Sequence, residues 1–421
     1  MKKIAQPDDL FSLLPGPKAE SWKYTNLKKF LPQEIVLNKS SKNTDCDIKK
    51  INQNTVSLQD SCTIWFKNGL LDNSESKLPK GMTIKKIESA QSDCHGFYLH
   101  PNKPVFSEKA QESTVFNNVE RLDNLLKINN LYGAPTYMIQ FDSNFNYNGY
   151  IEIKNVFKSS SPTINQQRLL FLINPNARVK IIEQNIDLSG SFSNFNNSVS
   201  EIICLDNSFL EHVVIGDQWQ NSCSVKSVFV TQKKKSQSFF YNFALNGKMS
   251  RNNYHVSLSE SFSSTNLYGF SCLNNKSHVD NFINVIHAAP ECKSSQLFKN
   301  IYNNNSSGVF FGGIFVDKNS QKTEAFQQNN NILLSERAHI NAIPKLEIFA
   351  DDVACSHGCT IGQPDFDAIF YLQSRGLKKE DAQSILNFAF LNDTFNKVSS
   401  KELENIIRKL VLNQLNLKHY S

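Results

Sequence analysis

The chain lacks any long apolar run, and none of its hydrophobic stretches approaches the roughly 20 residues that a membrane span needs. Its start carries Lys2 and Lys3 but continues into Pro7, Asp8 and Asp9 instead of the apolar core of an export signal. We therefore expect neither membrane insertion nor secretion, and the cytoplasm is the expected compartment.

Motifs that mark common catalytic sites are also missing. There is no GxxxxGK[ST] or GxGxxG phosphate loop, no GxSxG nucleophile elbow and no HExxH metal helix. Gly308, Gly312 and Gly313 stand in an apolar strand context without a following helix, which does not suit a phosphate cradle. These absences predict that the chain does not hydrolyse ATP and is not itself an enzyme.

Clustered charge and CxxC cysteine pairs are absent as well. The net charge of +6 is small for 421 residues, and the densest basic run, Lys233 to Lys235, is typical of a solvated turn, so nucleic-acid binding is not expected. Nine cysteines with an odd total argue against a disulfide framework or a four-thiolate zinc site. Most of them are predicted to be buried, reduced thiols.

What the chain does contain is a long series of short β-type runs. Between residues 131 and 362 such runs are separated by Asn, Ser and Gly, with hardly any helical period. Because this region is too long for an ordinary sandwich, it predicts a β-solenoid or a very large barrel, and a mainly β fold. Asn suits the tight corners of solenoid coils because its short amide tolerates left-handed backbone.

The first 130 residues are less regular, and we predict an N-terminal helical or mixed region. A small helical cap is expected up to about Leu31, a helix from Val119 to Leu126, and one strand over Cys62–Phe66. Trp22 to Thr25 suit a partner-facing patch or, more commonly for such residues, an internal anchor.

After Pro364 the hydrophobic period becomes helical, which predicts a C-terminal helical domain over residues 363–421. The first helix follows an acidic cap at Asp365 and ends at Gly376, and a second covers residues 380–390. The third begins with Ser399 and Glu402 at capping-box spacing, and its apolar face comprises Leu403, Ile406, Ile407, Leu410 and Val411. Packing of this face onto the β core is its more common role, ahead of partner binding.

One stretch, residues 344–362, combines sulfur and imidazole donors. Residues two apart in a strand face the same side, so Cys355 and His357 are expected to point together, and Cys359 continues that face. Such donors suit zinc, iron or an iron–sulfur cluster better than magnesium or calcium. The residues alone slightly favour a plainer interpretation, a buried cysteine beside a surface histidine. For His278 and His287 a structural role is likewise favoured over a ligand role.

The same stretch resembles the signature of the SufD proteins of iron–sulfur cluster assembly. In that family an LEI-aromatic-ADDV segment leads into CSHG, a small residue, Thr and Gly; here Leu346–Val353 leads into Cys355–Gly358. Further similar segments are Phe370–Gly376 (FYLQSRG), Lys322–Ala325, Asn331–Ser335 and Glu20–Thr25. The resemblance covers the last third of the chain well and the first thirty residues moderately, and the middle is similar only in β character and length.

This resemblance implies a right-handed parallel β-helix core with helical N-terminal and C-terminal parts, homologous to SufB. It implies a scaffold that pairs with SufB through the β-helix and docks the ATPase SufC through C-terminal helices. A transient iron–sulfur cluster would be shared with SufB, ATP would act only through SufC, and sulfur would come from a SufS–SufE type donor. The resemblance is also compatible with a homodimer of the isolated chain.

The resemblance carries over to named residues at the signature. Cys355 and His357 match the family's interface cysteine and histidine, and His357 is the expected iron or cluster ligand. Cys359 stands where the family usually has alanine. It either fills a small pocket as a spare thiol, the favoured interpretation, or alters ligation.

The expected SufC-docking region contains Phe370, Tyr371 and Arg375. Two alternative functions stay open. One is a β-helical enzyme that cleaves acidic polysaccharides, with Asp351 and Asp352 as acid–base carboxylates. The other is a purely structural docking subunit without metal ligation.

Overall fold

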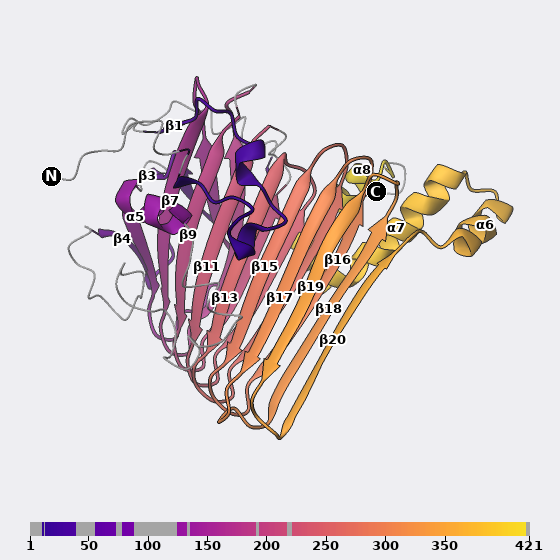
Figure 1. Ribbon diagram of the computed structural model, residues 1–421. Coiled ribbons are helices and arrows are strands. Elements are labelled where there is room, and N and C mark those ends of the chain that lie inside the picture. Colours follow the sequence, from indigo (N-terminus) through magenta and orange to yellow (C-terminus); the bar gives the residue numbers. More distant parts are fainter. Residues whose placement is uncertain are drawn as a thin grey trace.

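The structure, a computed structural model, describes residues 11, 13–38, 55–72, 78–87, 124–132, 135–190, 193–216 and 221–417. Its centre is a β-helix of two facing sheets, in which consecutive strands from β5 onward alternate between the sheets (Figure 1). Sheet A contains β1 (Val36–Leu37), β4 (Met82–Ile87), β5 (Thr136–Phe141), β7 (Thr163–Ile173), β9 (Phe195–Cys204), β11 (Cys223–Gln232), β13 (Met249–Leu258), β15 (His278–His287), β17 (Ser307–Val316) and β19 (His339–Ile348). Sheet B contains β2 (Cys62–Lys67), β3 (Leu70–Asp72), β6 (Ile151–Phe157), β8 (Arg178–Asp187), β10 (Phe209–Gly216), β12 (Gln237–Ala244), β14 (Ser264–Leu273), β16 (Lys293–Tyr302), β18 (Thr323–Leu333) and β20 (Val353–Gly362).

Each coil of the β-helix stacks in parallel on the coil before it. From β9 to β19, residues that pair across neighbouring strands of sheet A lie 26 to 32 residues apart in the chain. Alternate residues of both sheets point into the interior, where they form one apolar core from Ile64 and Phe66 to Phe310. The predicted parallel β-helix is therefore confirmed and the barrel alternative is wrong, because two separate sheets with free edges enclose the core. The right-handed coiling stays a prediction.

The corners of the coils use left-handed backbone, and asparagine occupies three of the seven such corners from sheet A to sheet B. Where the chain passes from sheet A to sheet B, positive φ angles of 56° to 63° recur at one residue per coil: Asn144, Asn176, Asn207, Lys235, Phe262, Glu291 and Lys322. The amide of Asn176 donates to the carbonyl of Asp206 in the next coil, and the amide of Asn207 donates to that of Lys234. Stacking of these corners satisfies backbone groups that would otherwise be unpaired.

The two ends of the β-helix differ. At the N-terminal end β3 pairs antiparallel with β2, and β4 pairs antiparallel with β5. The helical elements with described bounds at this end are two 3-10 turns, η1 (Glu20–Trp22) and η2 (Leu27–Lys29), and one helix, α5 (Asn124–Tyr132). Of the helix predicted over residues 119–126, residues 119–123 lie outside the described residues. The described helix α5 begins at Asn124 and continues past the predicted end to Tyr132.

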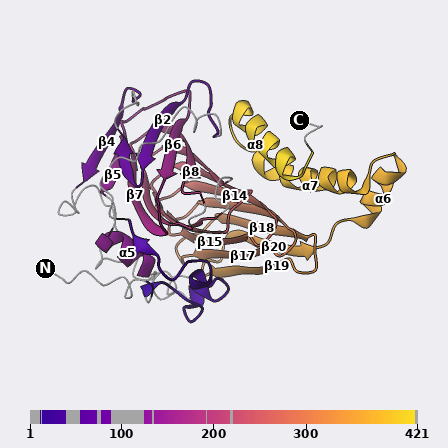
Figure 2. The same ribbon diagram turned by 90° about the horizontal axis from the view of Figure 1, so that it is seen from above.

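Three helices follow the last strand: α6 (Phe366–Ser374), α7 (Lys379–Phe395) and α8 (Lys401–Gln414). α7 and α8 cover the outer face of sheet B, whereas α6 projects beyond the body (Figure 2). Asp365 caps α6 as predicted, since its carboxylate accepts from the amide of Ala368 at 2.9 Å. The predicted cap of α8 is wrong by one residue, because Ser400 accepts from the amide of Leu403.

The packing role predicted for the face of α8 is confirmed. Leu403, Ile407 and Val411 are fully buried against sheet B residues such as Phe243 and Phe270. Each buried aliphatic side chain of this kind contributes about 1.5–3 kcal/mol. Within the described residues, no helix combines the length and apolar character needed to cross a bilayer.

Candidate functional site

The cysteine and histidine donors lie on β20, the last strand of sheet B. β20 pairs with β18 so that Cys355 is opposite Ala325, His357 opposite Gln327 and Cys359 opposite Asn329. Those three β18 residues are buried on the interior face of the sheet. Because side chains on paired strands share a face, Cys355, His357 and Cys359 all point toward the interior side of the last coil, as alternation predicts.

Burial at this site falls along the strand. Cys355 is half-buried and packs on the apolar cluster of Ile314, Val316 and Ala325, while His357 and Cys359 are exposed. Burial raises the pKa of the Cys355 thiol, although a hydrogen bond with the backbone of Ala325 partly opposes the rise. Burial also raises the pKa of the Cys359 thiol. Both thiols are therefore protonated at neutral pH, and a bound metal would have to displace their protons.

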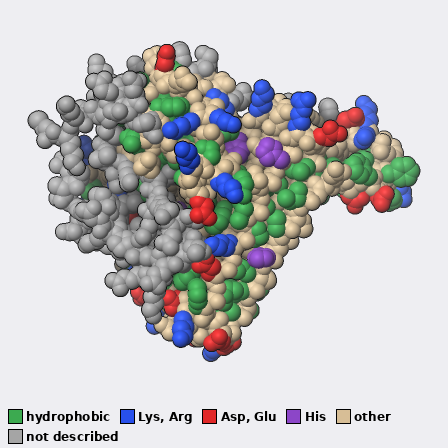
Figure 3. Space-filling model, in the orientation of Figure 1, with side chains coloured by type: hydrophobic (Ala, Val, Ile, Leu, Met, Phe, Trp, Pro, Cys, Tyr) green, Lys and Arg blue, Asp and Glu red, His purple; other side chains and the backbone are tan. Residues whose placement is uncertain are grey.

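The outer edges of β19 and β20 form an unpaired end face. Among the described strands, none pairs with the far edge of either. Pro344 stands within β19, a position that suits an edge strand because proline has no amide to donate. Ile348, Phe349 and Ile361 are 37%, 57% and 51% exposed there. In Figure 3, hydrophobic side chains spread over the strands toward this end of the molecule.

One chain does not supply a complete metal site at the end face. Across the part of the chain that the structure describes, no three His, Cys, Asp or Glu side chains lie close enough together to hold a metal ion. Soft metal ions and clusters in proteins usually take three or four such ligands. An ion held by Cys355 or His357 would therefore need further ligands from outside this chain.

A second exposed feature is the aromatic patch of α6, formed by Phe366, Phe370 and Tyr371. These side chains are 60%, 73% and 58% exposed. The guanidinium of Arg375 lies 5.3 Å from the centre of the Tyr371 ring. Large aromatic side chains at such exposure on a projecting helix are typical of protein interaction sites.

His278 and His287 are structural, as favoured from the sequence. His278 is buried, contacts Ser307 Oγ at 2.7 Å and Thr25 Oγ1 at 2.9 Å, and stacks on Phe30. Burial lowers the pKa of His278 to about 4, although Asp280 opposes the fall. His287 is fully buried and contacts Ser294 Oγ at 2.8 Å.

Trp22 and Thr25 of the N-terminal segment are anchors on the outer face of sheet A. The guanidinium of Arg251 lies 4.0 Å from the centre of the Trp22 ring and donates to Asp280 at 2.7 Å. Thr25 Oγ1 also donates to Asp280, at 2.5 Å. Sequence reasoning missed Arg251 and Asp280, because strand residues that lie more than 200 positions away carry no local signal of this contact.

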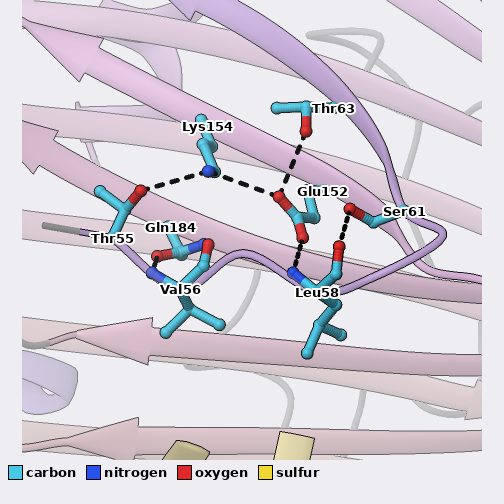
Figure 4. Close-up of polar contacts among 8 residues, drawn as sticks. All are labelled: Thr55, Val56, Leu58, Ser61, Thr63, Glu152, Lys154 and Gln184. Atoms are coloured by element: carbon cyan, nitrogen blue, oxygen red, sulfur yellow. Dashed lines mark hydrogen bonds and ion pairs between the residues drawn. The ribbon is translucent and has the colours of Figure 1, made fainter. Parts of the chain in front are cut away.

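A further polar cluster on the outer face of sheet B was also missed. Glu152 accepts from the amide of Leu58 at 2.7 Å, and Lys154 Nζ lies 3.4 Å from Glu152 and 3.1 Å from Thr55 Oγ1 (Figure 4). Gln184 pairs with both the amide and the carbonyl of Val56. These side chains hydrogen-bond the backbone of the segment before β2, as the backbone of a neighbouring strand would, so their role is structural.

Ionisable side chains also occupy the interior of the β-helix. Glu183 accepts from Lys226 and contacts His212 Nε2 at 3.2 Å, and all three are buried. Burial raises the pKa of Glu183, but Lys226 and His212 outweigh burial and hold it at about 2. Burial lowers the pKa of His212 and of Lys226. These contacts of Glu183 join β8, β10 and β11 and so help to specify the register of neighbouring coils.

The two carboxylates predicted for a polysaccharide-cleaving enzyme, Asp351 and Asp352, lie in the turn between β19 and β20. Asp351 and Asp352 are exposed, and the backbone of Asp352 accepts from the amide of Lys322 and donates to Gln321 Oε1. This arrangement closes the corner of the last coil. It does not favour acid–base catalysis.

Comparisons with known proteins identify one protein family. The family described as "SUF system FeS cluster assembly, SufBD core domain" matches residues 156–390, more than half of the chain. An iron–sulfur cluster assembly SufBD family protein of Synechocystis is 32% identical over 258 residues, which are 60% of this chain and 57% of that protein. Protein ABCI7, chloroplastic, of Arabidopsis thaliana is 30% identical over 249 residues, 59% of this chain and 52% of that protein.

The iron–sulfur cluster assembly protein SufD of Escherichia coli is 30% identical over 214 residues, 51% of this chain and 50% of that protein. The chain thus spans about half the length of these curated relatives in the aligned regions. The matched family region contains every strand from β7 to β20, together with α6 and most of α7.

Proposed function

Because the chain belongs to the SufBD family of SUF-system iron–sulfur cluster assembly proteins, we propose that it acts as a SufD-like, non-catalytic scaffold subunit. The iron–sulfur cluster is the cargo of this scaffold and not a resident cofactor. The observation that carries the proposal is the end face, where unpaired strand edges present Cys355 and His357 beside exposed apolar side chains.

The end face is proposed to pair with a SufB chain. Two β-helices that meet end to end can continue their sheets across the junction, since each free edge offers unpaired amides and carbonyls. Exposed Ile348, Phe349 and Ile361 would be buried by such pairing. The pairing would also cover Cys355 and His357, so that a nascent cluster lies between two chains.

Cys355 and His357 are proposed as this chain's ligands to iron or to the cluster. Cys355 would bind as the thiolate, and the positive charge of iron would favour loss of its proton. His357 would bind through a neutral imidazole nitrogen. Two donors from this chain leave the remaining positions of a tetrahedral iron to SufB and to sulfide.

The aromatic patch of α6, together with Arg375, is proposed to dock the ATPase SufC. ATP would then act on the complex only through SufC, and sulfur would arrive from a SufS–SufE type donor. The support for this assignment is the position of the patch, which projects from the body and lies outside the packed core (Figures 1 and 2).

The test is co-expression of this chain with SufB and SufC, followed by measurement of iron and acid-labile sulfide in the purified complex. We expect His357→Ala to lower the cluster content at least about tenfold while the complex still forms, because the imidazole is exposed. The matched control is His339→Ala, an exposed histidine at the start of β19. Normal cluster content in both His357→Ala and Cys355→Ala would instead identify a purely structural docking subunit.

A further inference from the structure

One corner between sheet A and sheet B, the corner that joins β13 to β14, carries an exposed phenylalanine on left-handed backbone. Phe262 has a φ angle of 63°, and its side chain is 47% exposed. Left-handed backbone is unfavourable for a bulky side chain, and an exposed ring gains little from burial in return. Asparagine holds the equivalent position at Asn176 and Asn207, where its short amide tolerates this backbone. Because local strain of this kind is concentrated at functional sites, Phe262 indicates a function at this corner.

The preceding corner places lysines beside Phe262. The amide of Lys235 donates to the carbonyl of Ser261 at 3.2 Å, so the corners that contain Lys235 and Phe262 are in direct contact. Both side chains are exposed. In Figure 1 the corners from sheet A to sheet B form the row of loops along the bottom, away from α6. This surface is therefore separate from the aromatic patch of α6.

The charge at these corners is positive. Glu260 lies 3.1 Å from Lys233 Nζ and accepts from the amide of Lys234 at 3.2 Å, so its charge is already neutralised by Lys233. No ion pair joins the ammonium group of Lys234 or of Lys235 to another residue in the described part of the chain. Two exposed cations beside an exposed phenylalanine suit a partner that carries carboxylates next to an apolar side chain.

Two further phenylalanines lie on the strands that follow these corners. Phe209 begins β10 and Phe239 lies within β12, both on the outer face of sheet B and both half-buried. Their ring centres are 5.7 Å apart and the ring planes are tilted by 41°. The guanidinium of Arg178 lies 4.4 Å from the centre of the Phe209 ring. Tilted rings offer no flat platform for stacked bases, but they suit contact with a single apolar side chain.

We propose that this corner patch binds an acidic polypeptide segment of a partner protein, whose carboxylates pair with the cations while one apolar side chain packs on the phenylalanines. The corner patch consists of Arg178, Phe209, Lys234, Lys235, Phe239 and Phe262. The strands that carry its phenylalanines belong to adjacent coils, and neighbouring strands lie about 4.8 Å apart, so about three extended residues span the patch. A nucleic acid fits less well, because Asp206 and Glu260 stand on the same corners and repel phosphate. The proposal uses neither the end face nor α6 and is therefore independent of the proposed function.

Binding is tested with the full-length, reduced chain and a fluorescent peptide that repeats Glu-Glu-Phe-Gly, measured by fluorescence anisotropy. We expect Lys234→Glu with Lys235→Glu to weaken binding about 30-fold, because two attractive charges become repulsive, and added salt should weaken binding to the parent chain. Phe262→Asn should weaken binding about tenfold through the lost apolar contact. The urea midpoint of Phe262→Asn should stay unchanged or rise, because asparagine tolerates left-handed backbone. Its loss of binding is then separate from any loss of fold.

The matched controls are Lys276→Glu with Arg337→Glu, two exposed cations on the opposite corners, and Phe326→Ala, an exposed phenylalanine on β18; both should bind the peptide like the parent chain. A peptide that repeats Glu-Glu-Ser-Gly should bind about tenfold more weakly than the phenylalanine-containing peptide. Equal binding by the parent chain and Phe262→Asn, or no binding of the phenylalanine-containing peptide, would overturn the proposal. So would tighter binding of oligothymidine, which would identify a nucleic-acid surface. A dimer of the parent chain that Phe262→Asn abolishes would identify a contact between two copies and overturn it as well.

Discussion

The contact that fixes α7 and α8 on sheet B centres on Glu211. This carboxylate is 1% exposed and accepts from the amide of Ser399 at 2.9 Å, from its hydroxyl, and from the hydroxyl of Tyr150 at 3.1 Å. Burial raises the pKa of Tyr150, and the neighbouring Glu211 charge raises it further, so the tyrosine stays a donor at every ordinary pH. Glu211 therefore binds the loop between α7 and α8 to β10.

Glu211→Ala removes the acceptor of three hydrogen bonds. Bonds to a charged group contribute about 1.5–3 kcal/mol each, but Ser399 is exposed, so water can replace the carboxylate there. Tyr150 is buried, and its hydroxyl keeps a contact with Ser399 Oγ, 3.3 Å away. We therefore expect a local loss of about 2–3 kcal/mol, and about 1 kcal/mol for Glu211→Gln, whose amide oxygen still accepts.

Hydrogen exchange of the α8 amides measures this loss directly. A loss of 2–3 kcal/mol corresponds to a fall in protection of about 30-fold to 150-fold, while amides of β14 and β15 in the core should change far less. Glu380→Gln, on the exposed first turn of α7, is the control and should change protection by less than about twofold. Equal protection in Glu211→Ala and in this control would refute the idea that Glu211 holds the helices.

Three further predictions concern packing, pH and docking. Gly308→Ala should destabilise the fold by about 1–3 kcal/mol in urea unfolding, because a Cβ at this position would overlap the buried ring of Tyr302. Unfolding free energy should fall as pH drops from 6.5 toward 4, since the unfolded chain protonates His278 at its ordinary pKa while the folded chain resists until about 4. The share due to this residue is about 2 kcal/mol at pH 5, and His278→Asn should remove it. Phe370→Ala with Tyr371→Ala should weaken SufC binding about 30-fold in calorimetry, without changing the unfolding free energy.

Each of these has a matched control in the chain. Gly358→Ala should be silent, because nothing lies within 4 Å of its Cβ position. His357→Asn, an exposed histidine, should keep the pH dependence of the parent chain. Phe326→Ala removes a phenylalanine that is 45% exposed on β18 and should leave SufC binding intact. A destabilised Gly358→Ala, a flat pH profile in the parent chain, or equal SufC loss in Phe326→Ala would contradict the respective argument.

The parts of the fold that local chemistry determines were predictable from the sequence. Short β-type runs separated by asparagine give coils with left-handed corners at Asn176 and Asn207, and Asp365 caps α6 where expected. The pairing of coils was not predictable, because parallel partners lie about 30 residues apart and leave no short-range signal. Alternation shows which residues share a face, but it does not show which face is inside. Glu183 and Lys226 therefore gave no sign that they lie in the core.

That Cys355 and His357 share one face of a strand could be predicted from the sequence, but their position at the end of the β-helix could not. Alternation alone placed Cys355 with His357, and the register of β20 on β18 shows this arrangement. That β20 is the last strand, with an open edge, depends on the whole series of coils before it. The one-residue error at the cap of α8 has a similar cause, since Ser399 is drawn away by Glu211, which lies 188 residues earlier.

The unlike termini of the β-helix limit how large an assembly can grow. At one terminus the outermost described strands are the antiparallel β3 and β4, of 3 and 6 residues, whereas β19 and β20 offer edges of 10 residues each at the other. A solenoid with two available termini could stack without limit and polymerise into fibres, as exposed strand edges commonly do. A solenoid with one such terminus can only join head to head, and the joined pair leaves no long strand edge on which a third chain could extend the sheets.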